Sequence, residues 1–532
     1  MIAPFKRLAA AGSKLSEQAL PVLLCATVFA FAMGSSSVHA AVRIGSPLRW
    51  LMLFALVVCA VLYGLPWVSA IPRRFAVTIA ALGGVGLLST SWSVTPRLTA
   101  ERTFSFLLLV VAVLCIAAGA AAERERIERV FLSVLAAADL IAVAGLLVLA
   151  VDSDTAIQPA AVTMPARLRG FGQNPNTAAM LFGLALPVAE WLAFSGRTSR
   201  WRKGGWASCV LLFGSIVASG SRGALLAAAA GTVLLIVFSV QGLRRMVPAV
   251  AVAVAVFGSA FHYGDVRPSL APKASAIASG AFAPSTRVAE VKPIASPTRP
   301  KPAKPTGQPK PTGQPKPTKP PGPSKGGGGR TTPGASKPSG PLVPAPVTPP
   351  PSRLKVGLKK GLTDADIPVP YVPREDEIGY PTLYEYKPIL AYGSGRVYAW
   401  LTAIRQGLQV PVLGYGFGTE NKVFVDRFYF FQGEFTENSF VGMFLQLGIV
   451  GVLLLLLPFV LVALVTIRLL RRPYGSDRAL TAVAAAIVAG GFVVAFFQSY
   501  LYSVGNIGTL SFWLAAALAI ALFPRAVPER RS

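Results

Sequence analysis

Residues 438–466 read NSFVGMFLQLGIVGVLLLLLPFVLVALVT and contain no Asp, Glu, Lys or Arg. This stretch is long enough to cross a bilayer as an α-helix, which needs about 20 apolar residues. Similar stretches recur along the chain, and 53% of its 532 residues are hydrophobic while only 14% are charged. Such a composition excludes an ordinary soluble enzyme, whose surface needs more charge, and a mainly disordered protein. The sequence therefore predicts an all-α, polytopic membrane protein.

The apolar stretches predict twelve membrane-spanning helices. Most of the connections between them are short, but one of them, residues 263–436, is much longer than the others. The predicted spans cover approximately residues 18–38, 49–70, 75–92, 103–121, 127–151, 175–195, 205–220, 222–241, 246–262, 438–466, 479–502 and 507–524.

The distribution of basic residues predicts the orientation of these spans. If the N-terminus lies in the cytoplasm, the connections and termini on that side carry 21 Lys and Arg, against 7 in the short connections on the other side. Positive charge concentrates on the cytoplasmic side of membrane proteins. We therefore expect a protein of the cytoplasmic membrane with both termini in the cytoplasm. In a soluble protein the net charge of +28 would suggest nucleic acid, but in a membrane protein the location of the charges decides, and we predict no nucleic-acid partner.

The first predicted span has an alternative interpretation. A basic start, followed by an apolar run and Val38-His39-Ala40, also resembles a cleavable signal peptide. We favour a membrane span because the run leads directly into the second span. Cleavage would leave the orientation of the other spans unchanged.

Composition divides the chain into four regions. They are nine spans in residues 1–262, a Pro/Lys/Gly-rich extracytoplasmic tether in 263–352, an ordered extracytoplasmic loop in 353–436, and three spans with a cytoplasmic tail in 437–532.

The tether is a low-complexity segment. Residues 268–351 hold 23 of the 44 prolines, and a Lys-Pro hexad repeats three times over residues 304–321. This sequence cannot bury a core, and it predicts an extended, disordered chain with polyproline-like character. A solvated spacer and a segment that binds an anionic cell-wall polymer or lipid surface are both compatible with it. The loop after the tether becomes aromatic, and residues 394–409 predict an amphipathic helix.

Cysteine and histidine do not predict a metal site. The four cysteines lie in separate apolar segments without a CxxC pair, and the chain has two histidines. No cluster of Asp and Glu in the apolar segments has the spacing of metal ligands. We therefore expect neither a metal nor another cofactor.

Two arginines begin predicted helices on the outer side. Arg222 lies in the tight connection SGSRG, and Arg396 begins the amphipathic helix. A helix N-terminus presents free N–H groups and positive partial charge, so an arginine beside it favours an anion such as phosphate. For Arg222, the alternative is a side chain that extends to the outer lipid headgroups.

Two further polar groups lie at outer ends of spans. RLRGFGQNPN (167–176) contains Arg169 and Asn176, which we assign to substrate binding together with Asn438. Asn174-Pro175 is typical of a helix start, so helix capping is the alternative for this group. Glu437 opens the tenth span with Thr436 as a predicted cap. Its carboxylate is either a partner of the helix dipole or a general base.

Taken in chain order, the four polar groups that contain Arg169, Arg222, Arg396 and Glu437 resemble the O-antigen ligase and Wzy-type polymerase superfamily of bacterial envelope proteins. The resemblance covers about residues 167–466, with the Pro-rich segment as an insertion. It rests on GFGQNPNTAAMLF (170–182), SGSRGALLAAAAG (219–231), GSGRVYAW (393–400) with LGYGFG (413–418), and ENSFVGMFLQLGIVG (437–451).

The resemblance implies a GT-C-like helical fold and a metal-independent glycosyltransferase. The implied donor is a polyprenyl-diphosphate-linked glycan on the outer face of the cytoplasmic membrane, and the acceptor is a glycan or a lipid. Arg222 and Arg396 would hold the diphosphate. Family ligases place a catalytic histidine where this chain has Glu437, so the sequence departs from the ligase pattern and is similar to polymerase-like members. Glutamate can still act as the base on an acceptor hydroxyl.

Two other classes of function stay open. A transporter or flippase of a polyprenyl-linked saccharide or small anion usually has charges at mid-bilayer. Asp139 is the clear case of such a charge in this sequence, and the other polar groups collect at one face. A non-enzymatic envelope protein would explain the tether but not the arginines and Glu437.

The predicted orientation can be tested in the long loop. We expect a cysteine at position 310, introduced by Lys310→Cys, to react with a membrane-impermeant thiol reagent in intact spheroplasts. Reaction only after the membrane is opened would place the loop in the cytoplasm and contradict the site assignments as well.

Overall fold

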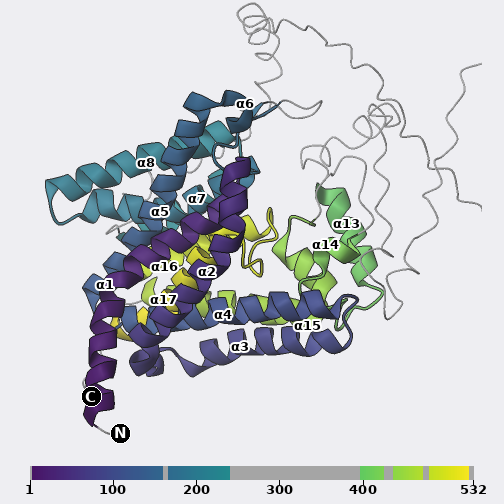
Figure 1. Cartoon of the computed structure of the whole chain (residues 1–532), viewed down its shortest axis with the longest axis horizontal. Helices are drawn as coiled ribbons and strands as arrows, with labels where there is room; N and C mark the ends of the chain where they lie inside the picture. Colours follow the sequence, from purple (N-terminus) through teal and green to yellow (C-terminus); the bar gives the residue numbers. More distant parts are fainter. Residues whose placement is uncertain (1–2, 160–165, 240–395, 425–434, 471–477, 527–532) are drawn as a thin grey trace, which may run out of the picture. The chain divides into compact units, whose positions relative to one another are not determined.

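The computed structural model describes residues 3–159, 166–239, 396–424, 435–470 and 478–526. These residues are mainly α-helical (Figure 1) and belong to one compact unit. Three predicted features lie wholly or mostly outside the described residues, namely the ninth span (246–262), the tether (263–352) and the ordered loop (353–436).

The helices before the long loop alternate with short connections. They are α1 (Ala3–Gly34), α2 (His39–Gly64), η1 (Leu65–Ala70), α3 (Arg73–Leu88), η2 (Ser89–Ser91), α4 (Pro96–Ala120), α5 (Arg124–Val151), α6 (Ser153–Ala156), α7 (Pro175–Ser195), α8 (Ser199–Ser219) and α9 (Arg222–Ser239). Two short antiparallel strands, β1 (Ile157–Gln158) and β2 (Arg167–Leu168), lie between α6 and α7.

Among the described residues, the part from Arg396 onward contains two short helices and three longer, apolar ones. They are α13 (Arg396–Gly407), α14 (Glu420–Val423), α15 (Ser439–Leu470), α16 (Arg478–Ala495) and α17 (Ile507–Ala526). Helix α3 packs against α4 and α15, and α13 and α14 lie beside α15 (Figure 1).

Within the described residues, eight helices are long and apolar enough to cross a membrane. The apolar helices Arg222–Phe238 and Ile507–Leu522 are shorter. The fold class of an all-α, multi-pass membrane protein is therefore supported, while the count of twelve spans stays a prediction. The seventh predicted span lies in α8, which is not one of the eight. Its first turns carry Arg200, Arg202 and Lys203, and these lower its hydropathy.

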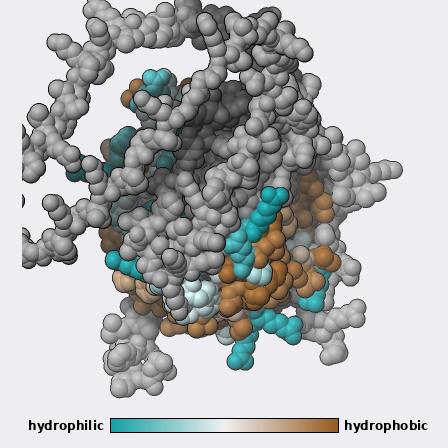
Figure 2. Space-filling model, turned by 90° about the vertical axis from the view of Figure 1, so that its right-hand side faces the viewer, coloured by the Kyte–Doolittle hydropathy of each residue, from teal (hydrophilic) through white to brown (hydrophobic). Residues whose placement is uncertain are grey.

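Large apolar side chains remain exposed along the outer faces of several helices. They recur every three or four residues, which places them on one face of each helix. On α2 they are Leu51, Phe54, Val58 and Leu62, and on α15 they are Leu453, Leu457, Val460 and Leu464. Figure 2 shows a broad hydrophobic area on the face that it presents. Exposed stripes of this kind suit contact with lipid chains rather than with water.

Helix α15 is not the continuous span that hydropathy predicts. Its backbone leaves the helical conformation at Leu447 and Gly448, and Gly448 has a φ of 60°. The preceding loop bonds to the break. The N–H groups of Tyr415 and Gly416 donate to the carbonyls of Leu445 (3.1 Å) and Gln446 (2.8 Å). These bonds give the carbonyls of Leu445 and Gln446 new partners in place of the helical ones that the break removes.

The eleventh predicted span is too long at its C-terminal end. Helix α16 ends at Ala495, and residues 496–506 form turns before α17. Ser439 Oγ fixes this segment by donating to the Gln498 carbonyl (2.7 Å) and accepting from the Tyr500 N–H (3.1 Å). The turn segment 496–506 therefore lies against the start of α15, where the candidate site is built.

Candidate functional site

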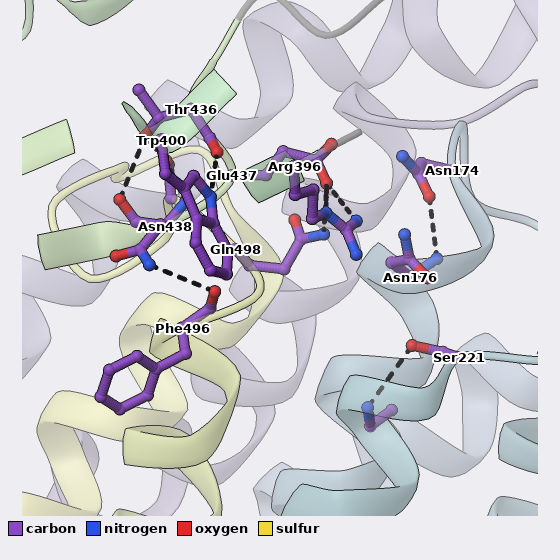
Figure 3. A network of polar contacts seen from close by, with 12 residues as sticks. Asn174, Asn176, Ser221, Arg396, Trp400, Thr436, Glu437, Asn438, Phe496 and Gln498 are labelled. Carbon is purple, nitrogen blue, oxygen red and sulfur yellow. Dashed lines mark hydrogen bonds and ion pairs between the residues drawn. The ribbon is translucent and has the colours of Figure 1, made fainter. Parts of the chain in front are cut away.

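An ion pair joins the starts of α13 and α15. Arg396 donates from Nε to Glu437 Oε2 at 2.9 Å, and its Nη2 contacts the same oxygen. Gln498 donates from Nε2 to that oxygen at 3.4 Å. Figure 3 shows Arg396 and Glu437 pointing toward each other with Gln498 next to them. Each side chain of the pair is 19% exposed, so the pair is accessible to a ligand. The structure thus brings together two residues that the sequence assigned to one site.

Glu437 has an unusual backbone conformation. Its φ of 50° makes it the one non-glycine residue with positive φ in the described ranges. This left-handed region costs about 1–2 kcal/mol for a residue with a Cβ, so the surrounding structure must hold it. Strain of this kind is concentrated at functional sites in proteins.

The residues on both sides of Glu437 are fixed by hydrogen bonds. The indole of Trp400 donates to the Thr436 carbonyl (2.9 Å), and the Asn438 N–H donates to Ser499 Oγ (3.1 Å). Helix α13 and segment 496–506 therefore anchor Glu437 from opposite sides, which explains how its strained backbone persists.

Asn438, which the sequence assigned to substrate binding, caps α15. Its Oδ1 accepts from the N–H groups of Phe440 (2.9 Å) and Val441 (3.1 Å), and its Nδ2 donates to the Phe496 carbonyl (3.3 Å). The predicted cap was Thr436, so that prediction is wrong. The capping preference of Asn explains the difference, because the helix begins at Ser439 and not earlier.

The start of α9 lies against the same turn segment. A Cβ added to Gly223 would lie 3.0 Å from the Phe497 side chain, so the chain here approaches the neighbour of Gln498 closely. Ser221 is buried, while Arg222 is exposed at the start of the helix. The N-terminus of α9 is thus connected to the Arg396–Glu437 pair through Phe497 and Gln498.

Arg169 and Asn176 take part in contacts within the protein. Arg169 donates to the backbone carbonyls of Thr155 (2.7 Å) and Asp154 (3.2 Å), which ties the strand β2 to α6. Asn176 accepts from Arg167 Nη2 at 2.9 Å. Asn174 caps α7 by accepting from the Asn176 N–H (2.9 Å), as its sequence pattern indicated (Figure 3). These contacts of Arg169 and Asn176 are structural.

The sequence analysis did not identify Glu420, which is buried beside the pair. Its side chain is 1% exposed, and its carboxylate receives five hydrogen bonds. The donors are Thr436 N (2.7 Å), Thr436 Oγ1 (2.8 Å) and Ser499 Oγ (2.8 Å) to Oε1, and Tyr502 Oη (2.7 Å) and Gln446 Nε2 (3.3 Å) to Oε2. Glu420 therefore connects three segments that converge on Glu437.

Burial raises the pKa of the Glu420 carboxyl, and the hydrogen bonds from Tyr502, Thr436 and Ser499 oppose this rise. Burial also raises the pKa of Tyr502 well above its usual range, and the neighbouring carboxylate raises it further. The phenol therefore keeps its proton and donates to Glu420. No spacing in the sequence marks Glu420, because it follows a glycine-rich turn and belongs to a helix of four residues.

The glycine-rich turn 414–418 is locked by two side chains from other helices. Arg102 of α4 contacts the Gly418 carbonyl through Nη1, and the Gly418 N–H donates to Gln446 Oε1 at 2.6 Å. The φ values of Gly414, Gly416 and Gly418 are all positive, which explains the glycine pattern. Arg102, which directly precedes the fourth predicted span, thus supports the site.

Helix α13 packs through small residues. Ala399 and Ala403 are fully buried beside Tyr415, Phe424 and Leu445, whereas Ile404 and Leu408 on the predicted apolar face are exposed. This exposed face suits contact with the bilayer surface.

Among the described residues, no group of three His, Cys, Asp or Glu side chains could hold a metal ion. No family model matches the chain, and no curated protein matches it. The resemblance to the O-antigen ligase superfamily therefore stays a prediction from the short motifs.

Proposed function

We propose that this chain is a glycosyltransferase that polymerises or ligates polyprenyl-diphosphate-linked glycans on the outer face of the cytoplasmic membrane. The observation that carries the proposal is the accessible Arg396–Glu437 pair, held at two helix starts beside the N-terminus of α9. An arginine fork suits the diphosphate of the donor, and a carboxylate suits an acceptor hydroxyl. The pair thus combines the two chemistries that glycosyl transfer from a diphosphate needs.

In the proposed reaction, the diphosphate competes with Glu437 for Arg396. It carries more charge and more oxygen acceptors than a carboxylate, so binding of the donor would release the Glu437 side chain. Arg222 at the start of α9 would bind the same diphosphate, with help from the free N–H groups of the helix.

The released Glu437 then takes the proton of the acceptor hydroxyl. The acceptor oxygen forms a bond to the anomeric carbon of the donor sugar while the bond from that carbon to the phosphate oxygen breaks. The polyprenyl diphosphate leaves with the electron pair of the broken bond, and the arginines stabilise the charge that develops on it. Because the backbone of Glu437 is fixed on both sides, its released side chain would stay within the site through these steps.

The proposal is tested with the purified full chain in proteoliposomes that contain a polyprenyl-diphosphate-linked oligosaccharide. We expect longer or transferred glycans, with polyprenyl diphosphate released in equal amount, and no change on addition of EDTA. Mass spectrometry of the lipid and glycan fractions measures both products. Absence of both products over a panel of donors, with the protein folded, would contradict the proposal.

Transport of a small anion or a lipid-linked saccharide is the second candidate. Two carboxyls lie within the helical bundle, where Asp139 accepts from Ser208 (2.7 Å) and Glu190 accepts from Thr232 (2.6 Å). Their second oxygens are buried without a hydrogen-bond partner in the described part of the chain. Buried carboxyls of this kind occur in proton and ion pathways. If the chain is a transporter, Asp139→Asn and Glu190→Gln should abolish its activity while Glu437→Gln should not.

A further inference from the structure

Arg49 of α2 is a cation in a candidate membrane span, and no anion contacts it in the described part of the structure. Its Nε is buried and has no hydrogen-bond partner there, and no carboxylate lies within ion-pair distance. Its guanidinium lies over the ring of Trp50, with Cζ 5.4 Å from the ring centroid. Arg126 also has a buried Nε without a partner, but its guanidinium pairs with Glu17 and Glu123. Arg49 has no such compensation.

Two glycines make room for the Arg49 side chain. A Cβ at Gly34, in the last turn of α1, would lie 3.2 Å from its Cδ. A Cβ at Gly505 would lie 3.3 Å from its Nη1. Both distances are shorter than ordinary contacts, so side chains at these positions would crowd the arginine. The guanidinium therefore occupies a slot between the end of α1 and the turn segment 496–506.

The uncompensated guanidinium is costly unless a ligand satisfies it. Arginine does not lose its proton in proteins, so it cannot become neutral. A buried N–H without an acceptor destabilises the folded protein, and a charge within the membrane region destabilises it further. An oxyanion with several acceptor oxygens would satisfy the charge at the part of the guanidinium that is not buried. In a membrane, phosphate is the oxyanion that lipids supply.

The slot and the candidate site both involve the turn segment 496–506. Segment 496–506 contains Gln498, which contacts Glu437. The turn after α1 bonds to the motif before α7, because Ser36 Oγ donates to the Phe171 carbonyl (2.6 Å) and the Gln173 N–H donates to the Ser35 carbonyl (2.9 Å). A phosphate at Arg49 would thus lie at the same end of the bundle as the pair.

We propose that Arg49, held in the slot between Gly34 and Gly505, binds the phosphate group of a lipid. The proposal does not depend on glycosyl transfer. The phosphate comes either from a membrane phospholipid or from a polyprenyl diphosphate, and the two sources share the chemistry that the arginine recognises.

This proposal is tested by measuring how two short-chain, water-soluble lipid probes bind to the full-length protein in detergent. The probes are a short-chain phosphatidylglycerol and a short-chain polyprenyl diphosphate, with a phosphate-free glycolipid as reference. We expect Arg49→Gln to weaken phosphate-probe binding at least about tenfold and to leave the reference unchanged. Arg43→Gln is the matched control, since Arg43 is exposed on the same helix. It should change binding of the phosphate probes less than twofold.

The pattern of losses identifies the source of the phosphate. Equal weakening of both phosphate probes supports a site for any lipid phosphate, and weakening of the diphosphate alone supports a site for a lipid-linked donor. Equal affinities in Arg49→Gln and Arg43→Gln would overturn the proposal. If Arg49→Gln does not fold, Gly505→Ala decides. This variant keeps the charge of Arg49 but crowds its Nη1, so it should weaken binding of the phosphate probes several-fold. Unchanged binding would refute the proposed role of the slot.

Discussion

Replacement of Glu420 by alanine is expected to lower the free energy of unfolding by about 3–5 kcal/mol and to abolish any activity of the site. The substitution removes the acceptor of five hydrogen bonds and leaves their donors buried without a partner. It also releases Thr436, whose position sets the backbone of Glu437. The melting temperature of the purified protein in detergent measures the loss of stability, and the rate of glycosyl transfer in proteoliposomes measures the loss of activity.

Two further variants show whether the effect arises from the network. Glu101→Ala removes a carboxylate that is exposed and paired with Arg97, so it should change the melting temperature little. Glu420→Gln should have an intermediate effect, since its amide nitrogen would face the Gln446 amide. Gln446 cannot reverse its amide, because its oxygen already accepts from the Gly418 N–H. A melting temperature in Glu420→Ala equal to that of Glu101→Ala would show that the network contributes no stability.

Hydropathy was sufficient to predict the helical membrane fold, because lipid-facing helices must be apolar over a fixed length. It could not predict the break at Leu447–Gly448. The residues before and after the break are equally apolar, and the bonds that compensate it come from a loop some 30 residues earlier in the chain. It also extended the eleventh span past Ala495, since Phe496, Phe497 and the following tyrosines continue an apolar pattern.

The residues of the site were predictable to different degrees. Arg396 and Glu437 were both assigned to helix starts, but their ion pair joins positions 41 residues apart that no periodicity relates. Glu420 and Gln498 were not predicted, because their roles come from contacts between three segments. The residue type of Asn438 already indicated a capping role, because Asn is favoured at helix N-caps. The sequence analysis assigned Asn438 to substrate binding instead.

Glu437→Gln is expected to reduce the rate of glycosyl transfer by a factor of about 10²–10⁴ while donor binding changes little. The amide has nearly the same shape as the carboxylate, so it can still lie beside Arg396 and Gln498. It cannot take a proton from the acceptor hydroxyl. Loss of the charge that pairs with Arg396 should also leave the arginine more available to the diphosphate, so donor affinity should stay equal or increase. Initial rates and donor binding in proteoliposomes measure the two quantities separately.

Substitutions on α13 complete this test. Arg396→Lys keeps the positive charge but loses the fork, so it should weaken donor binding and slow transfer together. Arg405→Lys is the matched control, because Arg405 is exposed on the same helix and touches neither Glu437 nor Gln498 in the described structure. The result that separates a base from a diphosphate ligand is a reduced rate in both variants with donor affinity weakened in Arg396→Lys only. If Glu437→Gln transfers glycans at the rate of Arg405→Lys, Glu437 is not the base, and its ion pair with Arg396 has a structural role only.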